Sequence, residues 1–447
     1  MGKDTQFKLL NFHKFIANFA TSLVGAFIPL LIYKATSNIR LAVLFLLGQG
    51  IFRIIGNHLF RRGYSRYPQL MLLLRTIPLL IYNITLIFLD KFMVVGIIIV
   101  SISYGLSTSI KNNANSVLLN YSSKKKAQSK LSISRVVDAL SSIVASIAGG
   151  LFLDWSQTAL IILSMSLYLI SVAPLFIYYL FNRGKKGFNR DFVSNAVIVY
   201  DKEPELKEKR KSIVKNFVLQ YYIFFFIFCV IDVFTNMYTL YLFVDVPTFS
   251  KAGYLNAMFQ IANLLGVLNL NLIMKKFDLR SANLIFGIVC AMPLAIIPFV
   301  RNNLIVYILF FVFGFAYAPC SYFMMDSLMT KCKILGCTNK ALVARQDGIV
   351  SGQMITPLIV LIFGDIAPVF IVMAVALVVY AVYTYIFENK LRFQLVDYLQ
   401  NNEIATGANK SKNEMGGKIE ISENIKKSDS LVSERENSAE DNEGKIS

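Results

Sequence analysis

Charged residues are scarce in this chain of 447 residues: they make up 16% of the sequence, while apolar residues make up 55%. A soluble protein of this length needs more charged surface than that. Histidine is rarer still, because His13 and His58 are the only two and lie far apart along the chain. A histidine-based metal site or a Ser-His-Asp catalytic group is therefore not indicated, and we expect neither an enzyme nor a bound metal or cofactor.

The five cysteines give no sign of a ligand set. Cys229, Cys290 and Cys320 lie in apolar segments. Cys332 and Cys337 share a loop that contains no histidine, so neither a zinc site nor a disulfide framework is supported. A Gly-x-x-x-x-Gly-Lys-Ser/Thr sequence is also absent from the chain. We therefore do not expect this chain to be driven by its own hydrolysis of ATP.

What the chain does contain is a series of long apolar segments. A hydrocarbon core of roughly 30 Å needs about 20 residues of helix to cross it. Helices suit lipid because they satisfy their backbone hydrogen bonds internally. Twelve segments of this kind are predicted, at residues 12–33, 41–60, 69–89, 92–119, 133–153, 158–181, 216–244, 252–274, 282–300, 304–329, 346–363 and 367–387. The sequence thus predicts an all-α integral membrane protein with twelve transmembrane helices.

The net charge of +18 is compatible with nucleic-acid binding, but the distribution of the basic residues argues against it. Every second loop is strongly basic, and these loops contain Arg61, Arg62, Arg66, Lys124, Lys125, Lys126, Lys130, the ten Lys and Arg residues from Arg183 to Lys215, Lys275, Lys276, Arg280, Lys331, Lys333 and Lys340. The loops between them contain only Lys34, Arg40, Lys91, Lys251 and Arg301. By the positive-inside rule we expect the basic loops and both termini to be cytoplasmic. The expected partners are membrane lipid and a small-molecule substrate, with no nucleic acid.

The chain is predicted to consist of two similar halves. We expect an N-terminal six-helix half at 1–181, a cytoplasmic linker at 182–215, a C-terminal six-helix half at 216–390 and a tail at 391–447. Asn18 precedes Thr21 in span one much as Asn236 precedes Thr239 in span seven. Further pairs of similar short sequences occur in the same order along both halves and indicate a parallel repeat. The tail lacks aromatic residues after Asn401, so we expect it to be mostly disordered.

A loop motif adds to this pattern. After span two the chain reads Gly56-Asn57-His58-Leu59-Phe60-Arg61-Arg62-Gly63. This run resembles the most recurrent motif of the major facilitator superfamily, with Phe60 where that family has an acid. The run 145–150 is a weak counterpart of the family's glycine-rich motif in span five. The resemblance covers residues 10–390. It implies a transporter, acting as a monomer, whose halves rock around a central cavity lined in part by spans four and seven.

Ionisable groups inside a span are costly, so they usually face the protein interior and have a function. Asp232 in span seven is our candidate for binding a proton or a cationic group. Lys111 in span four and Arg53 in span two favour an anionic or zwitterionic solute. The polar residues that complete the predicted site are Asn18, Asn113, Asn236, Tyr238, Gln260 and Asn263. Structural pairing and adhesion between helices remain the alternative roles for all of these residues.

A second group of charges lies at the predicted cytoplasmic ends of the spans. Its members are Arg61, Arg135, Asp138, Asp326, Arg345 and Asp347. In the family that the chain resembles, charges in this region hold the inner side closed. Ion pairs at a wet boundary can break at modest cost, as alternating access requires. We therefore predict an inner gate here, with simple topogenic charge as the alternative.

Together these patterns predict a secondary transporter of a small solute in the cell membrane, with proton coupling through Asp232 as a hypothesis. Two alternatives stay open. The same fold could export lipophilic compounds or flip lipids, which is compatible with the 36 Phe and 22 Tyr residues. The chain could also be a transport-inactive sensor or assembly partner that signals through its tail. The frequent use of Asn, Ile and Lys leads us to expect a bacterial source.

Overall fold

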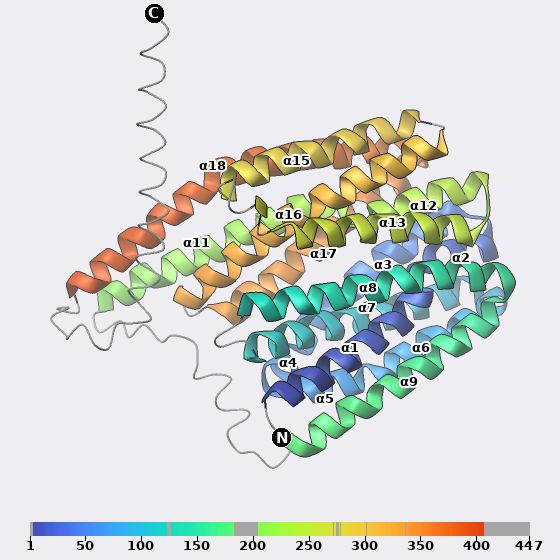
Figure 1. Ribbon diagram of the computed structural model, residues 1–447, viewed down its shortest axis with the longest axis horizontal. Coiled ribbons are helices and arrows are strands. Elements are labelled where there is room, and N and C mark those ends of the chain that lie inside the picture. Colours follow the sequence, from blue (N-terminus) through green and yellow to red (C-terminus); the bar gives the residue numbers. More distant parts are fainter. Residues whose placement is uncertain are drawn as a thin grey trace, which may run out of the picture. The chain divides into compact units, whose positions relative to one another are not determined.

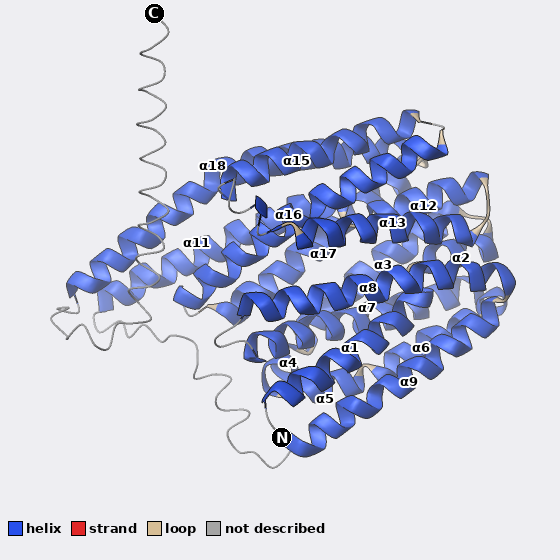
Figure 2. Cartoon of the chain, in the orientation of Figure 1, coloured by secondary structure: helices blue, strands red, loops and turns tan. Residues whose placement is uncertain are grey.

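The computed structural model describes residues 3–122, 127–182, 204–270, 272–273, 277, 279–300, 302–335 and 337–405. All regular elements within these ranges are helices (Figure 1 and Figure 2). The contacts reported below lie within one compact unit, formed by Met1–Tyr200 and Arg210–Arg392. The basic loop residues 124–126 and the side chains of Arg135 and Asp326, two predicted gate residues, lie outside the described part.

The N-terminal half contains the first six spans. Its helices are α1 (Lys3–Gly25), α2 (Ile28–Thr36), α3 (Ile39–Leu59), α4 (Arg61–Arg66), α5 (Pro68–Leu74), α6 (Thr76–Ile87), α7 (Leu89–Ser122), α8 (Ala127–Trp155) and α9 (Gln157–Asn182). The helices of the C-terminal half are α11 (Pro204–Phe228), the 3₁₀ turn η1 (Cys229–Ile231), α12 (Phe234–Asp245), α13 (Phe249–Leu268), α15 (Leu279–Ile296), η2 (Ile297–Phe299), α16 (Asn303–Leu335), α17 (Thr338–Phe363) and α18 (Ala367–Ala405).

The twelve predicted spans are found in this order. Eleven segments of the described residues are long and apolar enough to cross a membrane. The twelfth, predicted at 252–274, corresponds to α13, which ends at Leu268 and has a more polar sequence because Asn256, Gln260 and Asn263 interrupt it. The architecture is thus an all-α membrane bundle with twelve spans in two six-helix halves, as predicted.

Two spans are interrupted in ways that position polar groups. Span one is divided between α1 and α2, where Pro29 occupies the first turn of α2, a position that proline tolerates because no helical N–H is needed there. Span seven is divided between α11 and α12 by η1, after which Asp232 and Val233 precede the new helix. The N–H of Asp232 bonds the carbonyl of Cys229 at 3.2 Å. The carboxylate of Asp232 therefore projects from a break in the helix.

The two halves are joined along two seams, in which α8 packs against α13 and α3 packs against α17. Figure 1 shows α8 and α13 running side by side. Glycine permits this close approach, because a methyl group on Gly150 would lie only 2.7 Å from the carbonyl oxygen of Phe249. A methyl group on Gly253 would overlap the carbonyl oxygen of Ser146. The α8–α13 seam is therefore a backbone-to-backbone contact that leaves no room for a side chain.

Replacing the seam glycine with alanine tests this packing. Gly253→Ala should destabilise the fold by about 1–3 kcal/mol, because the new methyl group must push α8 and α13 apart. The measurement is the unfolding temperature of the purified protein in detergent, which we expect to fall.

Gly96→Ala is the matched control. Its methyl group would meet only side chains, the nearest being the Leu89 Cδ1 atom at 3.2 Å, and these can rotate away. Equal losses of stability in the two variants would contradict a tight backbone seam.

Candidate functional site

A chain of hydrogen bonds links the two halves through the interior of the bundle. The Arg53 guanidinium, on α3, donates from Nη1 to Oε1 of Gln353 on α17 at 2.7 Å. Gln353 Nε2 donates to Asp232 Oδ2 at 3.0 Å. The hydroxyl group of Tyr317, on α16, donates to the other carboxylate oxygen, Asp232 Oδ1, at 2.5 Å. We call Arg53, Gln353, Asp232 and Tyr317 the central chain.

The central chain connects opposite charges without direct contact between them. Arg53 and Asp232 are both half-buried and interact electrostatically. Gln353 accepts from the cation with its carbonyl oxygen and donates to the anion with its amide, so both halves of its side chain are used. The sequence predicted Arg53 and Asp232 as site residues but did not predict Gln353 or Tyr317, which are uncharged.

The predicted residues Asn18 and Asp138 meet inside the N-terminal half. Lys14 Nζ, on α1, lies 2.5 Å from Asp138 Oδ2, on α8. The side-chain amide of Asn18 donates to Asp138 Oδ1. Lys14 was absent from the predicted site. Its spacing was a usable signal, because residues four apart, such as Lys14 and Asn18, share one face of a helix.

Lys111, on α7, lies among other cations. It is close enough to Arg75, Arg53 and Lys14 for electrostatic interaction, and Asp138 is the acid that acts on it. Arg75 was not in the predicted site, although an arginine inside span three was visible in the sequence. It is 4% exposed. Its Nε donates to Ser107 Oγ at 3.1 Å, and its guanidinium carbon lies 5.3 Å from the ring centroid of Tyr168.

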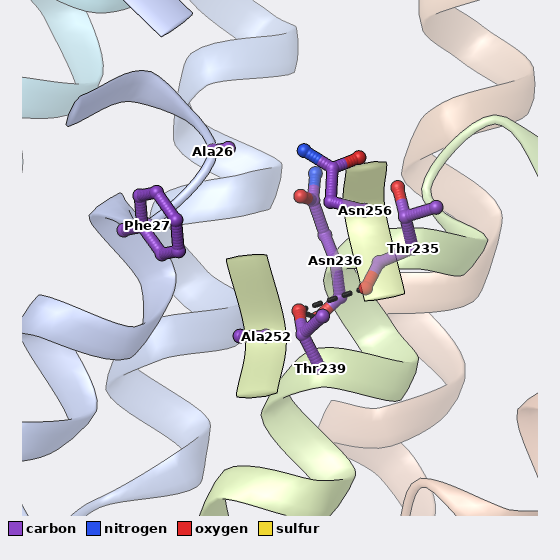
Figure 3. Close-up of a pocket in the computed structure, with 7 residues that line it drawn as sticks. All are labelled: Ala26, Phe27, Thr235, Asn236, Thr239, Ala252 and Asn256. Carbon is purple, nitrogen blue, oxygen red and sulfur yellow. Dashed lines mark hydrogen bonds between the residues drawn. The ribbon is translucent and has the colours of Figure 1, made fainter. Parts of the chain in front are cut away.

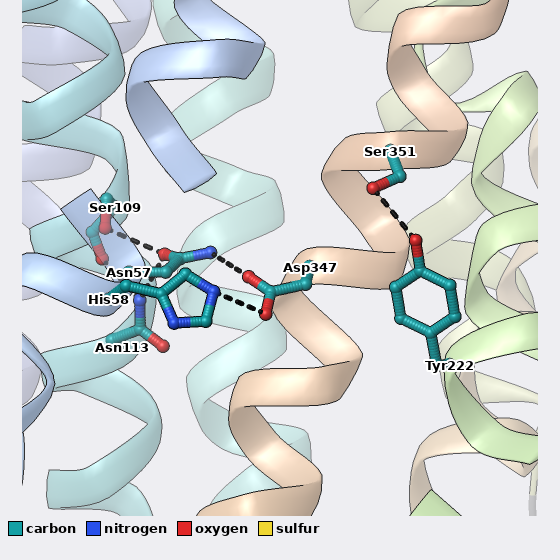
Figure 4. A network of polar contacts seen from close by, with 7 residues as sticks. All are labelled: Asn57, His58, Ser109, Asn113, Tyr222, Asp347 and Ser351. Atoms are coloured by element: carbon teal, nitrogen blue, oxygen red, sulfur yellow. Dashed lines mark hydrogen bonds and ion pairs between the residues drawn. The ribbon is translucent and has the colours of Figure 1, made fainter. Parts of the chain in front are cut away.

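A second polar network joins the halves at the end of α3 that leads into α4 (Figure 4). Asp347, on α17, accepts a bond from Asn57 Nδ2 at 3.1 Å and lies 3.1 Å from His58 Nε2. Asn57 Oδ1 in turn accepts from Ser109 Oγ at 2.8 Å and Asn113 Nδ2 at 2.7 Å, both on α7. Predicted gate residue Asp347 and predicted binding residue Asn113 thus belong to one network. We call Asp347, Asn57 and His58 the latch.

Tyr64 of α4 supports the latch from the N-terminal half. Its hydroxyl group donates to the carbonyl oxygen of Gly56 at 3.1 Å and lies 3.0 Å from Ser109 Oγ. Burial raises the pKa of Tyr64 to about 12. The hydroxyl group therefore stays protonated near neutral pH and has one proton to donate, either to the Gly56 carbonyl oxygen or to Ser109 Oγ.

A small pocket lies between the first span and the helices α12 and α13 (Figure 3). Its lining residues are Ala26, Phe27, Thr235, Asn236, Thr239, Ala252 and Asn256. Asn236 is one of the predicted binding residues. Asn256 donates from its amide to Ser146 Oγ at 2.8 Å, across the seam between the halves. The break in span seven thus starts a helix whose first turns supply polar groups to this pocket.

Three predicted binding residues have other surroundings. Tyr238 packs among aromatic rings, with centroid distances of 4.9 Å to Phe310 and 5.8 Å to Phe370. Gln260 and Asn263 are half-buried on α13. Within the described part of the chain, neither of these two side chains makes a hydrogen bond.

Of the remaining predicted gate residues, the structure describes the side chains of Arg61, Arg345 and Asp138. Arg61 is exposed at the start of α4 and forms no ion pair with any described residue. The guanidinium of Arg345 lies over the ring of Phe225, 5.3 Å from its centroid, in the same half. Asp138 pairs with Lys14 within the N-terminal half. Arg135 and Asp326 have side chains outside the described residues.

Comparisons with known proteins agree with this fold. The chain matches a family model described as Major Facilitator Superfamily over residues 11–336. A search of curated proteins finds no match. Among solved structures, the fucose:proton symporter FucP of E. coli superposes with a TM-score of 0.53 at 13% identity, covering 88% of this chain and 99% of its own.

Two further solved structures give similar values. The nucleoside transporter NupG has a TM-score of 0.55 at 13% identity, with 89% of this chain and 99% of its own covered. The xylose transporter XylE of E. coli, in a partially occluded inward-open conformation, has a TM-score of 0.57 at 14% identity, with 86% and 97% covered. Likeness at these identities shows the fold, while the family match covers most of the chain. On both grounds the chain is a multi-pass membrane protein that belongs to the major facilitator superfamily of transporters.

Proposed function

We propose that this protein is a secondary active transporter that moves a small polar solute across the cell membrane by alternating access. One observation carries the proposal: polar contacts join the two halves at separate places, among them the central chain and the latch. Contacts of this kind can form in one state of a transporter and break in the other. In this scheme the halves, predicted at 1–181 and 216–390, rock about the seams between α3 and α17 and between α8 and α13.

The solute site is centred on the central chain. Arg53 and Lys111 supply positive charge, which supports an anionic or zwitterionic solute. Asp232, at the break in span seven, is the candidate for a coupling proton or a cationic group. The pocket beside Asn236 is far smaller than the roughly 300–1,000 Å³ of most small-molecule sites, so in this scheme a solute enters only after the halves move apart. This polar interior supports a polar solute over the alternative of lipophilic cargo.

The latch is our candidate for the inner gate. It lies beside the basic loop that contains Arg61 and Arg62, which the positive-inside rule assigns to the cytoplasm. The His58 side chain is 56% exposed, so water competes for its contact with Asp347, and the net contribution of such an exposed contact is about 0–1 kcal/mol. That small value suits a gate that opens once in each cycle. We further propose a monomer in a bacterial cell membrane with both termini in the cytoplasm.

Removal of the Asp347 carboxylate tests whether the latch acts as the inner gate. Asp347→Ala removes the carboxylate that holds Asn57 and His58, so the inner side should open more often. A cysteine placed at Ser351 should then react about two- to fivefold faster with a membrane-impermeant maleimide added on the side of the loop at 61–66, as expected for losing up to about 1 kcal/mol.

Asp365→Ala is the control for the latch experiment, because Asp365 is an exposed acid beyond the opposite end of α17. It should leave the labelling rate unchanged. If Asp347→Ala labels no faster than the parent protein, the inner-gate assignment is wrong.

Neutralising the central acid tests coupling. Asp232→Asn keeps the shape of the side chain but removes its charge, so proton-driven transport should be lost. Proteoliposomes that contain a pH-sensitive dye report proton entry when succinate, glucose 6-phosphate or glucose is added outside. Asp245→Asn, at an exposed position at the end of α12, is the control and should behave like the wild type. Unchanged proton entry in Asp232→Asn would remove Asp232 from the coupling role.

A further inference from the structure

We propose that the transported solute is a dianion whose carboxylate or phosphate groups bind Lys111 and Arg53, with the charge of Arg75 behind them. This inference rests on the proposed function, since it names the class of solute that the transporter carries. It follows from the balance of charges, the unused hydrogen-bond donors and the position of these three residues in the membrane-spanning part of the chain.

The interior cations of the N-terminal half are not balanced by acids. Lys14 is neutralised by Asp138 at 2.5 Å. Arg53, Arg75 and Lys111 have no carboxylate within ion-pair distance among the described residues. The nearest acid along the central chain reaches Arg53 only through Gln353. Counted with Lys14, these four cations face two acids among the described residues, Asp138 and Asp232, and an excess of two positive charges remains.

These cations also act on one another. Lys111 interacts electrostatically with both Arg75 and Arg53. All three lie in segments that cross the membrane, where an uncompensated charge is costly and is usually retained only for a function. Like charges held together in a medium of low dielectric constant raise that cost further. An anion bound among them converts the repulsion into attraction, and a dianion cancels the excess completely.

Arg53, Arg75 and Lys111 also have hydrogen-bond donors that a bound anion can use. Arg53 uses Nη1 on Gln353, and its Nε is buried without a hydrogen-bond partner in the described part of the chain. Arg75 uses its Nε on Ser107. Lys111 makes no hydrogen bond to a described residue. A guanidinium presents paired N–H groups that match carboxylate or phosphate oxygens, and an ammonium adds a point charge to the same group.

The shared chemistry of the ligand is a pair of negative charges on carboxylate or phosphate oxygens. A neutral solute such as a hexose would leave the excess charge uncompensated. A zwitterion would bring a positive group into the same cluster. Both therefore fit the observed charges less well than a dicarboxylate or a phosphate monoester, and the two dianion classes are distinguished by the experiment.

The test is ligand-induced thermal stabilisation of the purified full-length protein in detergent. The probes are succinate, glucose 6-phosphate and glucose, each at constant ionic strength. We expect one of the two dianions to raise the unfolding temperature in a saturable way, and glucose to have no effect. Stabilisation by succinate alone identifies a dicarboxylate site, and stabilisation by glucose 6-phosphate alone identifies a phosphate monoester site.

Variants separate a specific site from general screening. Lys111→Gln should weaken dianion binding at least tenfold, because a buried charged contact is lost, and Lys111→Arg should restore part of it. Lys91→Gln is the control, since Lys91 is exposed at the start of α7. Equal stabilisation of the wild type and Lys111→Gln would overturn the inference, as would stabilisation by glucose alone or no response to either dianion.

The same probes distinguish this inference from the proposed function. Saturable dianion binding without flux in proteoliposomes would uphold the dianion site and overturn the assignment as a transporter of that solute. Flux of glucose without dianion binding would uphold transport and overturn the dianion site.

Discussion

The rest of the structure depends on the neutral amide of Gln353, which lies between the opposite charges of Arg53 and Asp232. Inside a membrane, a direct contact between Arg53 and Asp232 would be strong and slow to break, because no water replaces it. Gln353 satisfies both charges while it keeps them apart. Since Arg53 and Gln353 belong to different halves, rocking of the halves in the proposed cycle would break this connection. The break at η1 and the hydroxyl group of Tyr317 hold Asp232 in place for this contact.

Much of the fold could be predicted from the sequence because the bilayer imposes a simple rule on length and polarity. The spans, their order and the two halves all follow from runs of about 20 apolar residues. The break after Leu268 within span eight was not predicted, since a hydropathy pattern does not mark where one helix ends and the next helical residues begin. The break in span seven was not predicted, because Cys229-Val230-Ile231 contains no proline or glycine. Such a break reflects tertiary packing, which a local pattern does not contain.

The sequence marks candidate site residues most clearly where charge makes a residue stand out. Arg53, Asp232 and Asp347 were visible because each interrupts an apolar run. Their partners Gln353 and Asn57 are uncharged amides, and many amides in membrane helices only hold helices together. Arg53 and Gln353 are 300 positions apart, so their meeting depends on how the halves pack. The sequence therefore identified charges but could not assign each to its partner.

The seam between α8 and α13 has a consequence for the history of such proteins. At Gly150 and Gly253 the two helices meet through main-chain atoms, which are the same in every amino acid. Selection on this seam therefore acts on the size of the residues at a few positions. It places little demand on the identity of the surrounding side chains. In the proposed cycle, residues that contact cargo can differ without disturbing this contact between the halves. Because the two helices meet through main-chain atoms, the packing of the halves can be inherited while the residues that determine substrate specificity change.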